Sequence, residues 1–378
     1  MPGKRKLHRM ISKHRAVNYA GKPKHPGEKK RKKRVYALLF ILVGFGVLYF
    51  KKLPLIEFPG KGYEVLKKLA EETGEEQKER EPFLIQYAGA SEMYLQIRHA
   101  DGEVPVYVPP VAETKAISVK EILEERFGTL EEISFQSFLS NYYIEDVSTK
   151  ATEELLQPEK LANYNLGMKK TKEPQILIFH THGSEGYADS RNGMTEDTVI
   201  GVGELLAKEL RETYGYNVIH ETTVFDRKAD GTDDRNNAYN NALPVITRIL
   251  EENPSIEVVI DLHRDSGEAR TSVINGVRTA KVMLFNGLCR TKDGPITYYS
   301  NPNLEGNLAF SLHLQVVGNE LYPGLMHRNY LKSYRYNMHL KEKYLLVELG
   351  THKNTVEEAK AAMIPFAETV ATVLSGKE

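Results

Sequence analysis

The sequence has almost no cysteine, since Cys289 is the single one among 378 residues. An intramolecular disulfide is therefore excluded, and so is a zinc site built from several thiolates. The chain also lacks an extreme composition, with 41% hydrophobic and 27% charged residues, and no internal repeat is apparent. These values exclude the disordered and fibrous classes and indicate a globular protein of one large or two modest domains.

The formal net charge of zero conceals an uneven distribution. Residues 1–34 hold 14 of the 51 Lys and Arg residues but one of the 51 Asp and Glu residues. Residues 35–378 therefore hold 37 basic and 50 acidic residues. A basic tail before an acidic body has two interpretations, nucleic-acid binding and membrane topology. The segment that follows the tail decides between them.

Residues 35–50 contain no charge, and two lysines follow immediately. The run is short for a spanning helix, which needs about 17–25 residues, but the next apolar residues lengthen it if the lysines extend to the headgroups. No small-x-small cleavage motif follows, which argues against a cleaved signal peptide, and the basic flank argues against a core helix. We predict a single-pass anchor at 35–57 in the cell membrane, with tail 1–34 cytoplasmic, the body outside and no nucleic-acid partner.

The remaining chain divides near a charged stretch that ends in proline, Met168–Pro174. Residues 59–170 are interpreted as a membrane-proximal segment or small domain, with short strands within Phe83–Tyr107 and helical patterns between Ile117 and Ala162. In 171–378, strands and helices alternate. This alternation predicts an α/β fold in which helices flank a mostly parallel or mixed sheet.

The elements of 171–378 are predicted from apolar runs and helical spacing. The predicted strands are Gln175–Phe179, Tyr216–His220, Ile256–Leu262 and Tyr344–Leu349, with a hairpin of Thr271–Ile274 and Val277–Leu284 around the Asn275-Gly276 turn. The predicted helices are Val199–Leu210, Asn241–Glu252, Asn303–Leu321 and Thr355–Leu374.

Three polar motifs follow three of these strands: HTHGSE at 180–185, DLHRD at 261–265 and VELG at 347–350. Because the carboxyl ends of parallel strands meet in one crevice, we expect the motifs to converge. A catalytic zinc needs three protein ligands and an open position for water. His182 and His263 can supply two imidazole ligands, and an acid near the first motif can supply the third ligand. Glu348 can supply a carboxylate that moves the proton of the water.

Each motif also has an ordinary structural interpretation. A histidine after a strand is often a hydrogen-bonded edge residue, and Glu348 could be a buried acid paired with an arginine. Arg264 could hold a substrate carboxylate with two hydrogen bonds, or it could form a salt bridge with Asp265 that fixes the loop. The joint occurrence of the motifs at three strand ends favours the functional interpretation.

Four segments together resemble the stage II sporulation protein P family: HTHGSEGY, VIDLHRDS, the Asn-Gly hairpin and YLLVELGTHKNTVEEA. The resemblance covers the chain from about Thr171 to its C-terminus. It implies a zinc-dependent N-acetylmuramoyl-L-alanine amidase of the amidase-3 type, with an endopeptidase activity on stem-peptide cross-links of peptidoglycan. It also implies degradation of the septal wall during engulfment, together with stage II sporulation proteins D and M.

The resemblance assigns roles to individual residues. His182 falls on the zinc-binding histidine of the amidases' GHGG pattern, His263 on the second zinc histidine and Glu348 on the catalytic acid of VE-x-G. His180 falls where the amidases have no histidine, so its part as a ligand stays open.

The third ligand has two candidates. Glu196 opens the following helix in the amidase register, whereas Glu185 belongs to the sporulation-protein motif itself. A zinc endopeptidase with the same site, and a catalytically silent scaffold that binds glycan or partner proteins, remain the alternative functions.

Overall fold

The computed structural model describes residues 84–88, 92–96, 112 and 114–376. The predicted anchor at 35–57 lies outside these ranges. Among the described residues, no helix has the length and hydropathy to cross a bilayer. The short strands expected within Phe83–Tyr107 are present as an antiparallel pair, β1 (Leu84–Ala88) and β2 (Glu92–Gln96).

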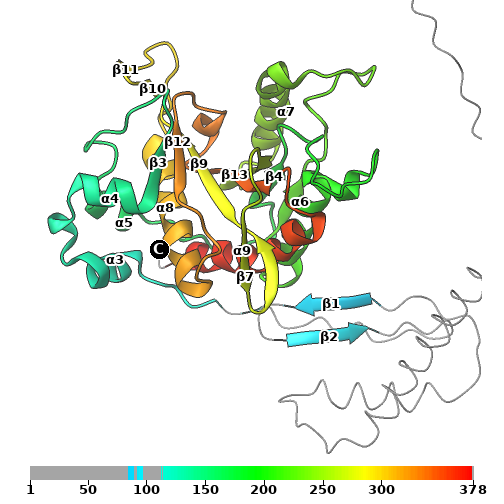
Figure 1. Cartoon of the computed structure of the whole chain (residues 1–378), viewed down its shortest axis with the longest axis horizontal. Coiled ribbons are helices and arrows are strands. Elements are labelled where there is room, and N and C mark those ends of the chain that lie inside the picture. Colours follow the sequence, from blue (N-terminus) through cyan, green and yellow to red (C-terminus); the bar gives the residue numbers. More distant parts are fainter. Residues whose placement is uncertain (1–83, 89–91, 97–111, 113, 377–378) are drawn as a thin grey trace, which may run out of the picture. The chain divides into compact units, whose positions relative to one another are not determined.

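A seven-stranded mixed sheet forms the centre of the fold (Figure 1). Neighbouring strands are parallel except for one antiparallel pair, β13 with β9. The predicted α/β class with a mostly parallel sheet and flanking helices is therefore confirmed. The strands, in spatial order, are β3 (Tyr143–Glu145), β12 (Asn329–Lys332), β9 (Val282–Gly287), β13 (Lys343–Thr351), β6 (Val258–Asp265), β4 (Ile176–Phe179) and β5 (Val218–His220).

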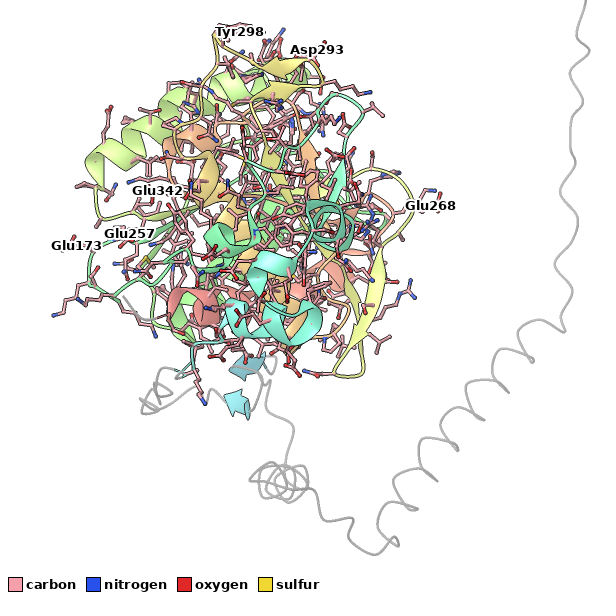
Figure 2. All side chains as sticks on the ribbon, turned by 90° about the vertical axis from the view of Figure 1, so that its left-hand side faces the viewer. Glu173, Glu257, Glu268, Asp293, Tyr298 and Glu342 are labelled. Atoms are coloured by element: carbon pink, nitrogen blue, oxygen red, sulfur yellow. The ribbon has the colours of Figure 1, made fainter. Side chains whose placement is uncertain are left out.

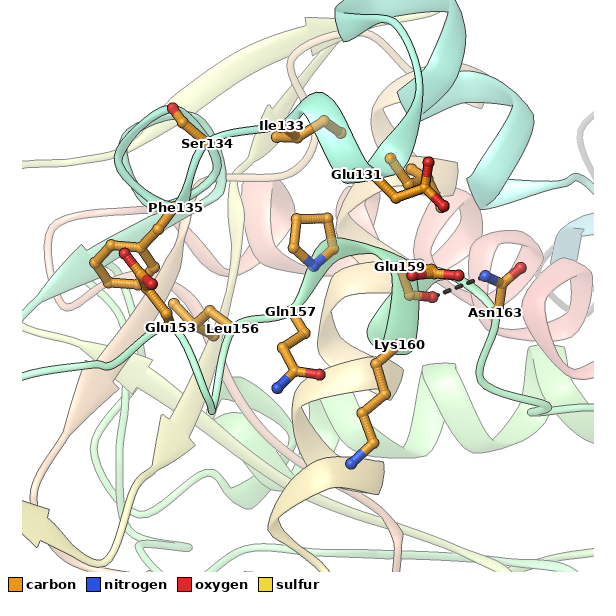
Figure 3. Close-up of a pocket in the computed structure, with 12 residues that line it drawn as sticks. Glu131, Ile133, Ser134, Phe135, Glu153, Leu156, Gln157, Glu159, Lys160 and Asn163 are labelled. Carbon is orange, nitrogen blue, oxygen red and sulfur yellow. Dashed lines mark hydrogen bonds between the residues drawn. The ribbon is translucent and has the colours of Figure 1, made fainter.

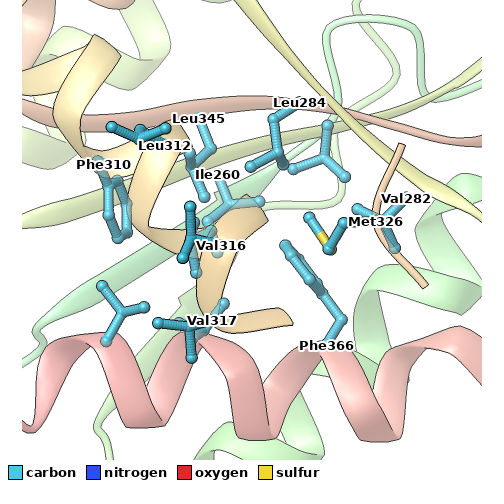
Figure 4. Packing of buried hydrophobic residues seen from close by; sticks show 14 of the residues in the cluster. Ile260, Val282, Leu284, Phe310, Leu312, Val316, Val317, Met326, Leu345 and Phe366 are labelled. Atoms are coloured by element: carbon cyan, nitrogen blue, oxygen red, sulfur yellow. The ribbon is translucent and has the colours of Figure 1, made fainter. Parts of the chain in front are cut away.

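Side chains alternate along these strands, so each face of the sheet has its own core. In β4, Ile176 and Ile178 pack into the larger core with helices α6, α8 and α9, while Leu177 and Phe179 pack against α7. Figure 4 shows the larger core, where Phe310 and Val316 of α8 and Phe366 of α9 meet strand residues. The four long helices are α6 (Val199–Glu212), α7 (Ala238–Glu252), α8 (Leu304–Leu321) and α9 (Val356–Leu374).

The described residues 114–170 belong to the same layered body as the strands that follow them. β3 pairs with β12 in the central sheet, and Leu123 and Phe138 are fully buried in the larger core. The body therefore begins well before the boundary expected at Met168–Pro174. The helices of this segment are α3 (Val119–Phe127), η1 (Leu130–Glu132), α4 (Phe135–Tyr142) and α5 (Pro158–Ala162).

A hollow of about 770 Å³ lies in this segment, with Glu131, Phe135, Glu153 and Lys160 in its lining (Figure 3). None of its described lining residues comes from the three polar motifs. The hollow is therefore separate from the site described below.

The hairpin around Asn275-Gly276 differs from its prediction in one respect. Its second arm ends as β8 (Val277–Ala280), which pairs with β7 (Thr271–Ile274), and the chain then enters the central sheet as β9. A single long arm was expected because the apolar pattern continues through Lys281. The sequence pattern does not show that the chain changes its partner strand at this point, from β7 to β13.

Candidate functional site

The structure brings the three polar motifs together at one end of the sheet. His182 follows β4, His263 lies in β6 and Glu348 lies in β13. β6 is between β4 and β13, and Glu348 stands directly opposite His263 in the strand register. The ring centroids of His182 and His263 are 5.3 Å apart. Two imidazoles and a carboxylate therefore share one small volume.

Glu185 lies beside this pair and is 3% exposed. Its Oε2 is 3.7 Å from Nδ1 of His263 and accepts a hydrogen bond of 3.0 Å from the backbone N–H of Arg264. The guanidinium groups of Arg264 and Arg235 both contact its Oε1. Arg264 also donates from Nε to the carbonyl of Gly186 at 3.0 Å. In this structure, Arg264 thus pairs with Glu185, and Asp265 pairs with Arg270 instead.

Glu196, the other candidate for the third ligand, is located differently. It lies in a short helix, η2 (Thr195–Asp197), its side chain is 53% exposed, and it contacts Arg191 at 3.5 Å. Of the two candidates, Glu185 is the one whose carboxylate adjoins His263, so the geometry favours Glu185 for a role at the histidine pair.

His180 is fully buried, and its ring lies among residues of β6, β5 and α6. Its Nδ1 is 2.9 Å from the carbonyl of Leu262 and its Nε2 is 2.9 Å from Nε2 of His220. A Cβ added at Gly203 of α6 would lie 2.5 Å from the ring, so only glycine fits there. Burial lowers the pKa of His180 to about 3. Both ring nitrogens are already engaged away from the pair, which fits a structural role.

Two further carboxylates, absent from the sequence prediction, lie beside the paired imidazoles. Asp261 is fully buried, lies 2.8 Å from Nε2 of His263, and accepts hydrogen bonds from the backbone and hydroxyl of Thr181. Asp226 is 3.8 Å from Nδ1 of His182 and accepts from Ser184. Asp261 was detectable, because it precedes His263 by two positions and so shares its face of the strand.

Three pKa values describe the electrostatics of the site. Burial, followed by the charge of His263, lowers the pKa of His182 to about 4. Burial would also lower the pKa of His263, but Asp261, Glu185 and Glu348 outweigh it and raise the value to about 9. Burial raises the pKa of Glu348 to about 7. The site therefore favours positive charge at His263, and Glu348 gains or loses its proton near neutral pH.

The donors at this site fit a divalent cation in their chemistry. Four carboxyl groups, those of Glu185, Glu348, Asp226 and Asp261, lie around the two imidazoles, and carboxylate and imidazole are both ligands that zinc accepts. Among the described residues, buried Nδ1 of His182 and Oε2 of Glu348 have no hydrogen-bond partner, although such atoms are normally satisfied. Within the same part of the chain, no three His, Cys, Asp or Glu side chains are already arranged as a metal site. In this structure the carboxylate of Glu185 is already paired with Arg264 and Arg235.

Comparison with protein families gives one family match. The model of the family described as stage II sporulation protein P (SpoIIP) matches residues 86–371. Stage II sporulation protein P of Bacillus subtilis (strain 168) is 25% identical over 268 residues, which is 66% of this chain and 60% of the relative. The chain therefore spans less than two thirds of the length of that relative.

Comparison with solved structures matches part of the chain to amidases of low sequence identity. An N-acetylmuramoyl-L-alanine amidase from Clostridium difficile 630 is 13% identical, covers 54% of this chain and 95% of its own, and has a TM-score of 0.32. The CwlD amidase from Clostridioides difficile, solved in complex with the GerS lipoprotein, is 16% identical, covers 53% and 94%, and has a TM-score of 0.34. Identities this low do not transfer a function.

Proposed function

The chain belongs to the stage II sporulation protein P family, and from this premise we propose that it is a zinc-dependent peptidoglycan hydrolase. The bond we assign to it is the amide between N-acetylmuramic acid and L-alanine. The observation that carries the proposal is the meeting of the His182 and His263 rings, with centroids 5.3 Å apart, beside the carboxylates of Glu185 and Glu348. Imidazole and carboxylate are the ligands of zinc in many hydrolases.

His182, His263 and Glu185 would hold the metal. When bound, zinc supplies a water molecule acidified toward neutral pH and a positive charge for the carbonyl oxygen of the substrate. Glu348 takes the proton of the attacking water and passes it to the leaving amine, and a pKa of about 7 suits a group that must both accept and release it. Asp261 orients His263, as carboxylates commonly do for histidine ligands.

Arg264 has a second part in the proposal. Its guanidinium and that of Arg235 now share Glu185. A cation on that carboxylate would weaken both contacts, and the freed guanidinium of Arg264 can then bind a stem-peptide carboxylate with two parallel hydrogen bonds.

The family and the sequence support finer proposals. We assign the protein an additional endopeptidase activity on stem-peptide cross-links, and a place in septal wall degradation during engulfment with stage II sporulation proteins D and M. An anchor at 35–57 would hold the body outside the cell membrane, where its substrate is.

The test uses the full chain in detergent, with metal analysis and digestion of purified sacculi. We expect one zinc per chain and release of intact stem peptides that begin with L-alanine. Glu348→Gln should keep the zinc and release nothing. Shortened peptides alone would assign the activity to an endopeptidase. A chain that binds no zinc and releases no product would be a scaffold, and the hydrolase proposal would be wrong.

A further inference from the structure

A series of tyrosine rings leads away from the histidine pair. Tyr239, in the first turn of α7, stacks on His263 with centroids 6.3 Å apart and meets His182 edge-on at 5.7 Å. Tyr336 is 5.4 Å from Tyr239, and Tyr334 is 6.4 Å from Tyr336. We call Tyr239, Tyr336 and Tyr334 the tyrosine strip. Its inner rings are partly buried, whereas Tyr334 is 57% exposed. The strip thus connects the site to the surface.

The strip extends across the sheet toward β9. Tyr336 packs edge-on against Phe285 of β9, with centroids 4.8 Å apart. A Cβ added at Gly287, the last residue of β9, would lie 2.0 Å from the carbonyl oxygen of Tyr334. The loop that carries the two tyrosines therefore lies directly on the end of β9. The two arginines that contact Glu185, Arg264 and Arg235, belong to the other side, near β4 and β6.

The loop is held in an unusual conformation. Tyr336 and Asn337 have φ values of 49° and 60°, in the left-handed region that non-glycine residues rarely adopt. Nδ2 of Asn337 donates to the carbonyl of Tyr239 at 3.0 Å, and Arg335 donates to the carbonyl of Ser300 while stacking on Tyr299. Backbone strain of this kind persists where surrounding contacts determine it and is concentrated at functional sites. The loop therefore holds the rings of Tyr334 and Tyr336 in fixed positions.

We propose that the tyrosine strip binds a sugar ring of the glycan strand, with Tyr334 as the outermost stacking surface; this inference rests on the proposed function. The scissile amide joins a sugar to a peptide, so the two flanks of the site need different chemistry. Arginines on the β4 side suit peptide carboxylates. An aromatic face on the β9 side suits the apolar C–H face of a pyranose, and aromatic side chains commonly line ligand sites.

The test measures binding of peptide-free glycan strands to the full chain in detergent by calorimetry. These strands carry no amide to cleave, so binding is measured apart from hydrolysis. Tyr334→Ala should weaken binding about tenfold, as expected for loss of an aromatic anchor. Tyr334→Phe keeps the stacking face and should stay within about twofold of wild type. Val273→Ala, on β7 and 67% exposed in wild type, is the matched surface control and should bind normally.

Two results would overturn the subsite. One is unchanged binding by Tyr334→Ala; the other is an equal loss in Tyr334→Phe, which would assign the contact to the hydroxyl. Sacculus digestion by the same proteins separates this inference from the hydrolase proposal. If the Tyr334→Ala variant binds glycan strands normally and digests sacculi normally, the subsite is rejected and the hydrolase proposal stands. Binding that depends on Tyr334, in a wild-type chain that digests nothing, supports the subsite and rejects the hydrolase.

Discussion

Glu348→Gln should stabilise the metal-free chain at pH 8 while it abolishes hydrolysis of the wall. The carboxyl of Glu348 is desolvated, and Oε2 is buried without a hydrogen-bond partner among the described residues. Glutamine has nearly the same shape but cannot ionise. The substitution therefore removes the cost of holding a charge there and removes the proton carrier at the same time.

The magnitude follows from the pKa of about 7 in the fold and 4.5 as the ordinary value. At about 1.4 kcal/mol for each pKa unit, ionisation in the fold costs about 3 kcal/mol more than in the unfolded chain. Below pH 4.5 the carboxyl is protonated in both states, and the stability it contributes is fully present. That stability is lost as the pH rises from 4.5 through about 7, because only the unfolded chain ionises freely.

The assay is urea unfolding of chelator-treated protein at pH 5 and pH 8. The variant should unfold with a free energy within about 1 kcal/mol of that of wild type at pH 5, and about 3 kcal/mol higher at pH 8. Glu173→Gln provides the control, because Glu173 is exposed at the periphery (Figure 2), and it should match wild type at both pH values. Equal stability of wild type and Glu348→Gln at pH 8 would refute the claim that the fold desolvates this carboxyl.

Three other substitutions test the surroundings of the site. Asp261→Asn removes the carboxylate beside one paired imidazole and should weaken zinc binding about 10- to 100-fold, measured by competition with a chelator; unchanged affinity would contradict an orienting role. Gly203→Ala brings a Cβ to 2.5 Å from the ring of His180 and should lower the free energy of unfolding by about 1–3 kcal/mol, and a neutral result would mean that the ring can move. Gly287→Ala should displace Tyr334 and reduce glycan-strand binding about as much as Tyr334→Ala, whereas normal binding would show that the loop tolerates the shift.

The parts of the site that the sequence predicted are those encoded by long apolar runs. β4, β6 and β13 lie in runs of consecutive apolar residues, and the polar residue at the end of each run marks where the strand reaches the edge of the sheet. Parallel neighbours then bring His182, His263 and Glu348 together whatever their separation in the chain.

The parts that were missed depend on partners distant in sequence. β3 (YIE) and β12 (NYLK) contain no run of consecutive apolar residues like that of β4, and they pair with each other although they lie far apart in the chain. Asp226 and Tyr239 come from the loop after β5 and the start of α7, where spacing carries no signal of direction. The choice between Glu185 and Glu196 also required coordinates, because loop geometry decides which acid turns inward.

The pairing of β3 with β12 has a consequence for how the chain must mature. Residues 143–145 have no partner strand until residues 329–331 have been synthesised and have folded into the sheet. This edge of the sheet therefore forms late. Contacts this distant in sequence slow folding, and until closure β12 presents an unprotected edge that invites aggregation. In a truncated chain that starts at residue 171, β3 is missing and this edge of β12 stays unpaired.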